Sequence, residues 1–300
     1  MLTKSQTRKK PNMTNSFQTC GLAGALKSCG WRPDAGGGGN RLALDVEHDT
    51  PAALEFTSDD ADFEHAVLRT AAHRPPAREK ALYANSDLLG PGKWVVAPGG
   101  APLCRFDVPK EFAAGSKGIG AESRCKGGGG PRHAWAAAVT AVARGRWDEV
   151  EAKPRALDAM ADELKQAGWA ASVDDGQLRV HVHLLGAYCP LTLEVRGPAD
   201  VRVAAELFQW SALPSASRRA ILAFAADANL RLPLVRLAIA PEGGVKRLRA
   251  EVALTAQCAF VSSGWLAAAV EAVETAVTLC ARELPVLRDE ALAQLVLAAS

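Results

Sequence analysis

The sequence predicts an α+β protein in which two small domains of one kind follow each other, each with the order α-β-β-β-α-β-β-α. Three observations lead to this fold class. A Gly-Trp pair ends a helix-like stretch in each half, as Gly30-Trp31 and Gly168-Trp169. Each pair is followed by runs of alternating apolar and polar residues, the period of a half-buried strand. Similar turns and helical runs then recur in the same order, which is typical of an internal repeat.

The opening helix and the strands after it are predicted from their apolar spacing. Helical runs cover 17–29 in the first copy and 157–167 in the second, and a glycine at the helix end is common C-cap chemistry. The dipeptide at 175–176 is typical of a hairpin turn. The expected strands are 42–47, 54–56 and 63–68 in the first copy and 178–184, 193–195 and 201–207 in the second.

A proline-marked break opens the middle helix of each copy. Pro75-Pro76 precedes the run 78–85, and Pro214 precedes the run 217–229. A turn rich in proline and glycine then joins two strands into a hairpin. The hairpin strands are expected at 94–96 and 103–108 in the first copy and at 237–239 and 248–254 in the second, and the last helices at 136–142 and 267–273.

The domain boundaries follow from these elements. The 300-residue chain is expected to begin with a disordered basic tail at 1–14. A first domain at 15–145 carries a glycine-rich loop at 110–132, which is expected to be flexible. A linker at 146–154 leads to a second domain at 155–300, which ends in a helix near 290–297.

The bulk composition limits the classes of partner. A net charge of +2 is too small to indicate nucleic acid or an anionic membrane. No run approaches the ~18 apolar residues of a membrane span. The seven cysteines are odd in number and show no CxxC spacing, which argues against a disulfide framework or a zinc site. The basic start is not followed by an apolar stretch, so the sequence favours free thiols in a cytoplasmic protein.

The second copy, about residues 155–284, resembles the YbjN family and the related type III secretion chaperones. The residues that carry the resemblance are Gly168, Trp169, Leu213, Pro214, Asn229 and Trp265, together with the strand pattern between them. It implies a non-enzymatic domain with a twisted antiparallel sheet and packed helices, often dimeric, that binds segments of other proteins. Two fused copies would then form a pseudo-dimer within a monomeric chain. No catalytic, cofactor-binding or metal-binding residue is carried over.

His181 and His183 are the best candidates for a metal site. Two residues apart on a strand, they project from one face, as paired imidazole ligands can. The alternative is the polar face of a half-buried strand, because we match these positions with Asp45 and Glu47 of the first copy. A third ligand is not evident nearby in the sequence, so no metal is expected.

Two further features lie in the glycine-rich loop. Residues 115–120 place Lys117 among glycines but lack the GK[ST] ending of a phosphate-binding loop. Cys125 has basic neighbours that could lower a thiol pKa, and His133 is the histidine close to it in sequence. A flexible loop with an exposed, inert thiol is the simpler interpretation, so neither nucleotide binding nor a catalytic Cys–His pair is expected.

Tryptophans recur at corresponding positions of the two copies, where one element ends and the next begins. Trp31 is matched with Trp169, and Trp135 with Trp265, and recurrence at element junctions favours core packing over a binding role. Arg218 and Arg219 are expected to be solvated helix residues rather than an anion site.

The middle helices are the expected contact between the copies. Leu222 and Phe224 lie on different sides of their helix, so one can face its own sheet while the other meets the neighbouring copy. We match these two residues with Leu82 and Tyr83 of the first copy.

The sequence therefore predicts a non-enzymatic module that binds an unidentified protein partner, in a chaperone-like or adaptor role. Two alternatives remain. One is a metal-dependent enzyme that uses the strand face of His181 and His183. The other is a structural subunit of a larger assembly.

Overall fold

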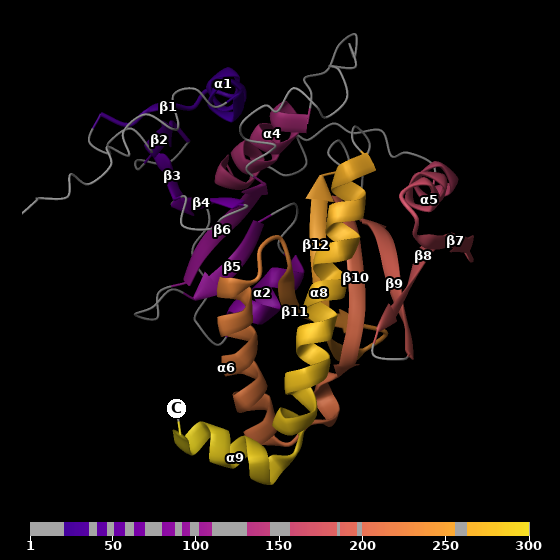
Figure 1. The fold of residues 1–300 in the computed structure, drawn as a ribbon. Coiled ribbons are helices and arrows are strands. Elements are labelled where there is room, and N and C mark those ends of the chain that lie inside the picture. The colour runs from indigo at the N-terminus through magenta and orange to yellow at the C-terminus, as the bar shows by residue number, and fades with distance from the viewer. Residues whose placement is uncertain are drawn as a thin grey trace, which may run out of the picture.

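The structure is a computed structural model in which two α+β halves follow each other along the chain (Figure 1). It describes residues 21–35, 41–46, 51–57, 63–69, 80–87, 92–96, 102–109, 131–144, 157–184, 187–196, 200–255 and 263–299. The expected tail at 1–14, the linker at 146–154 and all but the last two residues of the expected loop at 110–132 lie outside these ranges.

The described elements confirm the α+β fold class. The first half contains the helices α1 (Gly21–Ser28), α2 (Ala81–Asp87) and α4 (Pro131–Arg144) and the strands β1 (Arg32–Pro33), β2 (Arg41–Leu44), β3 (Ala52–Thr57), β4 (Phe63–Arg69), β5 (Gly92–Val96) and β6 (Pro102–Pro109). The second half contains α5 (Leu157–Gln166), α6 (Ser215–Arg231), α8 (Ser263–Arg288) and α9 (Glu290–Ala299), the short 3-10 helix η2 (Trp210–Ala212), and the strands β7 (Ala170–Asp174), β8 (Gln177–Leu184), β9 (Ala187–Arg196), β10 (Asp200–Gln209), β11 (Arg236–Glu242) and β12 (Val245–Thr255).

The two sheets have the same strand order. The first runs β1-β2-β3-β4-β6-β5 and the second β7-β8-β9-β10-β12-β11, and every pairing between described strands is antiparallel. Each described sheet has six strands, one more than the sequence predicted. The additional strand directly follows the Gly-Trp pair. It was missed because β1 is two residues long and β7 is exposed at most of its positions, so neither shows a clear alternation.

The first helix of each half ends in the same way. Gly30 and Gly168 have φ angles of 95° and 92°, the left-handed region that glycine occupies without a steric penalty. The amide of Trp31 donates to the carbonyl of Leu26 (3.1 Å), and the amide of Trp169 donates to that of Leu164 (2.9 Å). This is the C-cap that the sequence indicated.

The strand pairing carries this equivalence across both sheets. It makes Leu42 equivalent to Val180, Leu54 to Leu191, Ala66 to Val203, Cys104 to Ala250 and Trp94 to Leu237. His181 is therefore equivalent to Ala43 and His183 to Asp45, and the expected match with Asp45 and Glu47 is wrong by two residues. A slip of two keeps every side chain on its face, so an apolar pattern of period two does not detect it.

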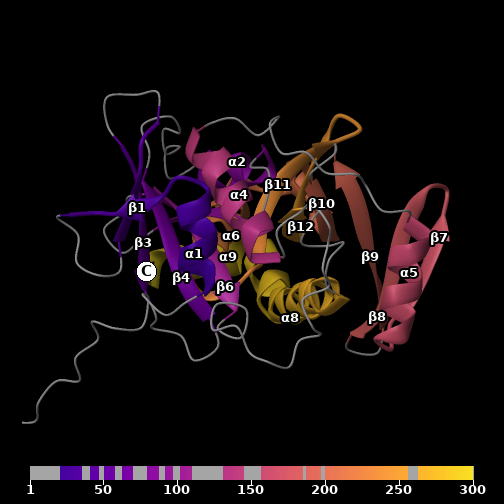
Figure 2. The same ribbon diagram turned by 90° about the horizontal axis from the view of Figure 1, so that it is seen from above.

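Helices pack against both sheets. In the second half α5 packs on β7 and β8, and α8 packs on β10 and β12 (Figures 1 and 2). In the first half α1 packs against α4, and Trp135 of α4 meets Phe106 of β6 edge to face, with 6.1 Å between ring centroids. The indole of Trp31 donates to Thr140 Oγ1 of α4 (2.8 Å), which fixes the end of α1 to that helix.

The expected C-terminal helix is present as α9, which packs against α6 and α8. None of the described helices combines the length and the apolar composition needed to cross a membrane.

Candidate functional site

The most extensive polar network in the described residues lies between the two halves, where β5 and β11 are the inner edge strands of their sheets (Figure 1). Helix α2 of the first half packs on its own β5 and also on β11. Helix α6 of the second half packs on its own β11 and also on β5, and the two helices contact each other. Each middle helix therefore joins the two sheets.

Two buried asparagines bind the edge strands in the same way. Asn85 of α2 accepts a hydrogen bond from the amide of Trp94 (2.6 Å) and donates to the carbonyl of the same residue (3.2 Å). Asn229 of α6 accepts from the amide of Leu237 (2.6 Å) and donates to its carbonyl (3.0 Å). Asn85 also donates across the halves to the carbonyl of Leu237 (3.4 Å).

A buried cation on each edge strand reaches the backbone of the other half. Lys93 of β5 donates to the carbonyl of Val235 (3.2 Å), and Arg236 of β11 donates to the carbonyl of Gly92 (2.8 Å). The sheet register makes Lys93 equivalent to Arg236 and Gly92 equivalent to Val235. The two contacts are therefore reciprocal: the same position on each strand binds the same position on the other.

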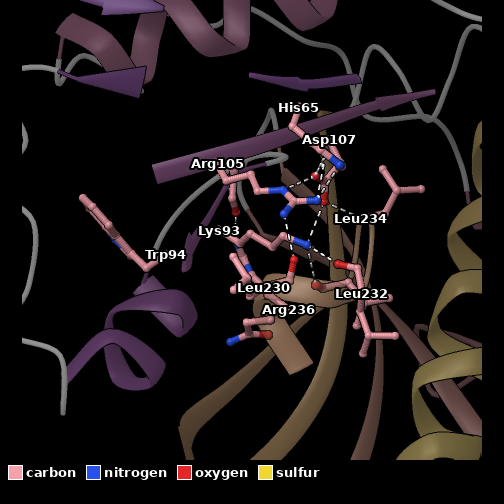
Figure 3. A network of polar contacts seen from close by, with 12 residues as sticks. His65, Lys93, Trp94, Arg105, Asp107, Leu230, Leu232, Leu234 and Arg236 are labelled. Carbon is pink, nitrogen blue, oxygen red and sulfur yellow. Dashed lines mark hydrogen bonds and ion pairs between the residues drawn. The ribbon is translucent and has the colours of Figure 1, made fainter. Parts of the chain in front are cut away.

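Asp107 of β6 is the centre of the network (Figure 3). Its carboxylate lies 2.7 Å from Lys93 Nζ, 2.6 Å from Arg105 Nε and 2.8 Å from His65 Nδ1. It also accepts a hydrogen bond from the backbone amide of Leu234 in the second half (2.7 Å). All four side chains are buried, with exposed fractions of 9% or less.

The same cations bind the carbonyl end of α6. Arg105 Nη1 donates to the carbonyl of Leu230 (2.7 Å), and Lys93 Nζ donates to that of Leu232. The last carbonyls of a helix have no intrahelical partner and carry partial negative charge, so cations stabilise them. Two strand residues of the first half thus cap a helix of the second half.

A second buried ion cluster lies in the second sheet. Glu251 Oε1 of β12 lies 2.8 Å from Arg236 Nε and 3.1 Å from Arg202 Nη1, and all three side chains are at most 1% exposed. Arg202 is equivalent to His65, and Glu251 is equivalent to Arg105. The position of Asp107 is occupied by Ala253. The two sheets therefore share a cation at the site of Lys93 and Arg236, carry opposite charges at the site of Arg105 and Glu251, and differ at the site of Asp107.

Burial and charge shift the pKa values in opposing ways. Burial alone would raise the pKa of Asp107, but Lys93, the His65 hydrogen bond and Arg105 outweigh it and hold the pKa well below its usual range. Burial lowers the pKa of Lys93, and the charge of Asp107 opposes this effect. Asp107 is therefore ionised throughout the physiological range, with its lone pairs directed to four donors.

The geometry suits a structural role rather than proton transfer. A general base needs an available lone pair and access to a substrate, and it works best with a pKa near the working pH. The carboxylate of Asp107 has a low pKa, is 2% exposed and binds residues of both halves. What the network can do is fix the loop between α6 and β11 against the first sheet.

The sequence-predicted candidates lie elsewhere. The side chain of His181 is exposed on β8, and that of His183 lies outside the described residues. Across the described ranges, no group of three or more His, Cys, Asp or Glu side chains is arranged to hold a metal ion. Residues 115–120 and Cys125 also lie outside these ranges, as does the side chain of His133.

Most of the remaining candidates can be placed. Trp31 and Trp135 are buried, as core packing predicted, whereas Trp169 is half-buried and the side chain of Trp265 lies outside the described residues. Arg218 and Arg219 are exposed on α6, as expected.

The middle helices meet, as expected, but the residues were matched wrongly. Because Asn85 and Asn229 have the same role, Leu82 corresponds to Ala226 and Tyr83 to Asp227, not to Leu222 and Phe224. Tyr83 nevertheless contacts the second half: its hydroxyl accepts a hydrogen bond from the indole of Trp210 (3.1 Å), and Lys246 Nζ lies 5.0 Å from its ring centroid.

Sequence reasoning missed the network. Lys93, Arg105 and Asp107 alternate with the buried Trp94, Cys104 and Phe106, a pattern that predicts a solvated strand face. The one usable signal was an asparagine toward the end of each middle helix. A scan against models of protein families found no match for this chain, and a search of curated proteins found no significant one.

Proposed function

We propose that the chain is a non-enzymatic protein-binding module in which the two halves form a pseudo-dimer. The observation that carries this proposal is the reciprocal contact between the edge strands, Lys93 to Val235 and Arg236 to Gly92. Reciprocal contacts between equivalent positions are the property of a twofold interface. The expected resemblance of the second half to the YbjN family and type III secretion chaperones agrees with this arrangement, since such domains often pair.

The contact between the halves does not offer the binding surface. The side chains that fill it are buried and bound to one another, so a partner would have to separate the halves to reach them. This argues against the groove between the halves as the binding site. The partner is expected on an outer surface.

The C-terminal helices carry the most prominent exposed apolar surface of the described residues. Leu292, Leu295 and Val296 of α9 and Val286 of α8 are 42%, 67%, 42% and 44% exposed. From Ala291 to Ala299 the helix has no charged residue, and it buries only the side that includes Ala293. A helix that is apolar around most of its circumference is usually buried on more than one side. We propose this surface, the α9 face, as the place where the protein partner binds.

The test compares two single substitutions of exposed apolar residues. Leu295→Glu places a charge on the α9 face, and Val173→Glu places one on β7 at the far edge of the second sheet. Immobilised wild-type chain and both variants are used to capture proteins from the native host, and the captured proteins are identified by mass spectrometry. We expect wild type and Val173→Glu to retain the same partner and Leu295→Glu to lose it.

Two results contradict the proposal. If the wild-type chain captures no protein above an empty-resin control, the binding role fails. If Leu295→Glu retains the partner as well as Val173→Glu does, the partner binds elsewhere and the α9 face is the wrong surface.

A further inference from the structure

The loop between α6 and β11 has a backbone conformation that needs support. Leu234 has a φ angle of 59°, in the left-handed region that a leucine rarely adopts. Such residues persist where the surroundings hold them in place. Here the support comes from the other half of the chain, because the amide of Leu234 donates to Asp107.

The first half is complementary to this loop in charge and in hydrogen bonding. Asp107 meets an amide, and Arg105 meets the carbonyl of Leu230 at the end of α6. An acceptor thus faces a donor, and a cation faces the negative end of a helix. Both residues lie on β6, two positions apart on the same face of the strand.

The second half does not carry this complement. Its residue equivalent to Asp107 is Ala253, and its residue equivalent to Arg105 is Glu251. A second copy of this half, seated where the first half lies, would leave the amide of Leu234 without a carboxylate. It would also put Glu251, whose carboxylate binds Arg236 and Arg202, in the place of Arg105. The cation that donates to the carbonyl end of α6 would then be missing.

The reciprocal contact alone does not distinguish the two pairings. Lys93 is equivalent to Arg236, and either cation can donate to the backbone of an opposite edge strand. Discrimination between partners requires a contact that is favourable in one pairing and unfavourable in the other. In the described residues, Arg105 and Asp107 meet that requirement.

We propose that Arg105 and Asp107 determine the pairing: they make the first half the preferred partner of the second half, in place of another copy of the second half. This inference rests on the proposed pseudo-dimer and explains why the two halves of one chain pair with each other. Without these residues, the second halves of two chains would be free to pair with each other. That exchange would link chains into larger assemblies.

The experiment uses the full chain with a protease recognition sequence inserted in the expected linker at 146–154. The chain is purified intact and then cut, and native mass spectrometry identifies the pairs that the two halves form. The variants are Asp107→Ala, Arg105→Gln and Ala253→Asp. The last introduces a carboxylate opposite Arg202 in the β10–β12 pairing, as Asp107 lies opposite His65. Asp45→Ala, at an exposed ion pair, is the control.

For wild type and Asp45→Ala we expect pairs of unlike halves and no pairs of second halves. Asp107→Ala and Arg105→Gln should each weaken the pairing of unlike halves, by on the order of tenfold or more for Asp107→Ala. Ala253→Asp should produce pairs of second halves. Thermal melting of the uncut chains shows which variants are folded. If Asp107→Ala does not fold, Arg105→Gln is the variant that is compared with wild type.

The two proposals fail in different ways. If the wild-type halves separate when the linker is cut, the pseudo-dimer is wrong. If unlike halves stay paired, the pseudo-dimer stands. The pairing role of Arg105 and Asp107 is then wrong if wild type forms pairs of second halves as readily as pairs of unlike halves. It is also wrong if Asp107→Ala and Arg105→Gln leave the pairing unchanged.

Discussion

The carboxylate of Asp107 accepts a hydrogen bond from the backbone amide of Leu234, a residue 127 positions later in the chain and in the other half. The same carboxylate forms ion pairs with Lys93 and Arg105, and both of these donate to backbone carbonyls of the second half. The side chain of Asp107 therefore neutralises buried cations of the first sheet and also binds the backbone of a loop in the second half.

Asp107→Ala should lower the free energy of unfolding by about 3–5 kcal/mol, the usual cost of leaving a buried cation without its counter-ion. Urea denaturation measures this change in the free energy of unfolding. The control is Asp45→Ala, whose carboxylate pairs with Arg32 at the surface, where both side chains are more than 60% exposed. An exposed pair contributes less than about 1 kcal/mol. Equal losses in the two variants would show that the network does not stabilise the fold.

The same carboxylate should make stability depend on pH in the acid range. The pKa of Asp107 is lowered in the folded protein, whereas an unfolded aspartate has a pKa of about 3.9. Below that value the unfolded chain binds a proton that folded Asp107 does not, so its contribution is complete above about pH 4 and is lost as the pH falls further.

Asp107→Asn should therefore reduce the slope of unfolding free energy against pH below pH 4, by up to about 1.4 kcal/mol per pH unit. The measurement is urea denaturation at a series of pH values, for wild type and variant together. The prediction is wrong if the two slopes are equal, because the folded pKa of Asp107 would then match its unfolded value.

Local chemistry made much of the fold predictable. The Gly-Trp pairs give a helix end that needs a left-handed glycine, and the later match of Trp94 with Leu237 agrees with the sheet register. The register error at His181 arose because a slip of two leaves an alternating pattern intact. The strand β1 was missed because Arg32 and Pro33 are too short a run to show any period.

The network was not predictable from the chain pattern, for a physical reason. Alternation separates the two faces of a strand, but it does not say what covers the polar face. Lys93, Arg105 and Asp107 are buried because α6 and the start of β11 lie against them, and that contact joins residues more than a hundred positions apart. The sequence match of Leu82 with Leu222 failed similarly, because it rested on size and not on the shared role of Asn85 and Asn229.

The matched tryptophans should differ in their contribution to stability. Trp31 is 2% exposed and donates to Thr140, so Trp31→Ala should cost about 3–5 kcal/mol. Trp169 is half-buried, so Trp169→Ala should cost roughly 1–2 kcal/mol, because less apolar surface is removed from water. Urea denaturation of both variants tests this order. Equal losses at the two positions would mean that the two tryptophans are buried alike.

Two thiols should be unreactive in the folded protein. Burial raises the pKa of Cys104 and of Cys280 to about 12, and both are free. The thiolate is the nucleophile, so alkylation at pH 8 should be slow at both positions until the chain is unfolded. Peptide mass spectrometry after iodoacetamide treatment, with and without urea, measures it. Labelling of Cys104 at the same rate in both conditions would place it on an open surface.

The two asparagines should protect one edge-strand amide each. Asn85 Oδ1 accepts the amide of Trp94 and Asn229 Oδ1 accepts that of Leu237, both at 2.6 Å. Removing a buried acceptor leaves the amide unsatisfied, at a cost of about 1–3 kcal/mol. Asn85→Ala should therefore speed hydrogen exchange at Trp94, and Asn229→Ala at Leu237, each by roughly tenfold or more if local opening governs exchange.

Each variant is the matched control for the other, because the side chain removed, its burial and the bond lost are the same in both halves. The two are not identical across the contact, since Asn85 also donates to the carbonyl of Leu237. Asn85→Ala should therefore disturb β11 as well as β5, whereas Asn229→Ala should leave the Trp94 amide protected. Hydrogen exchange followed by NMR resolves the two amides. If both variants affect both amides equally, the asparagines support the contact as a whole and do not each hold one strand.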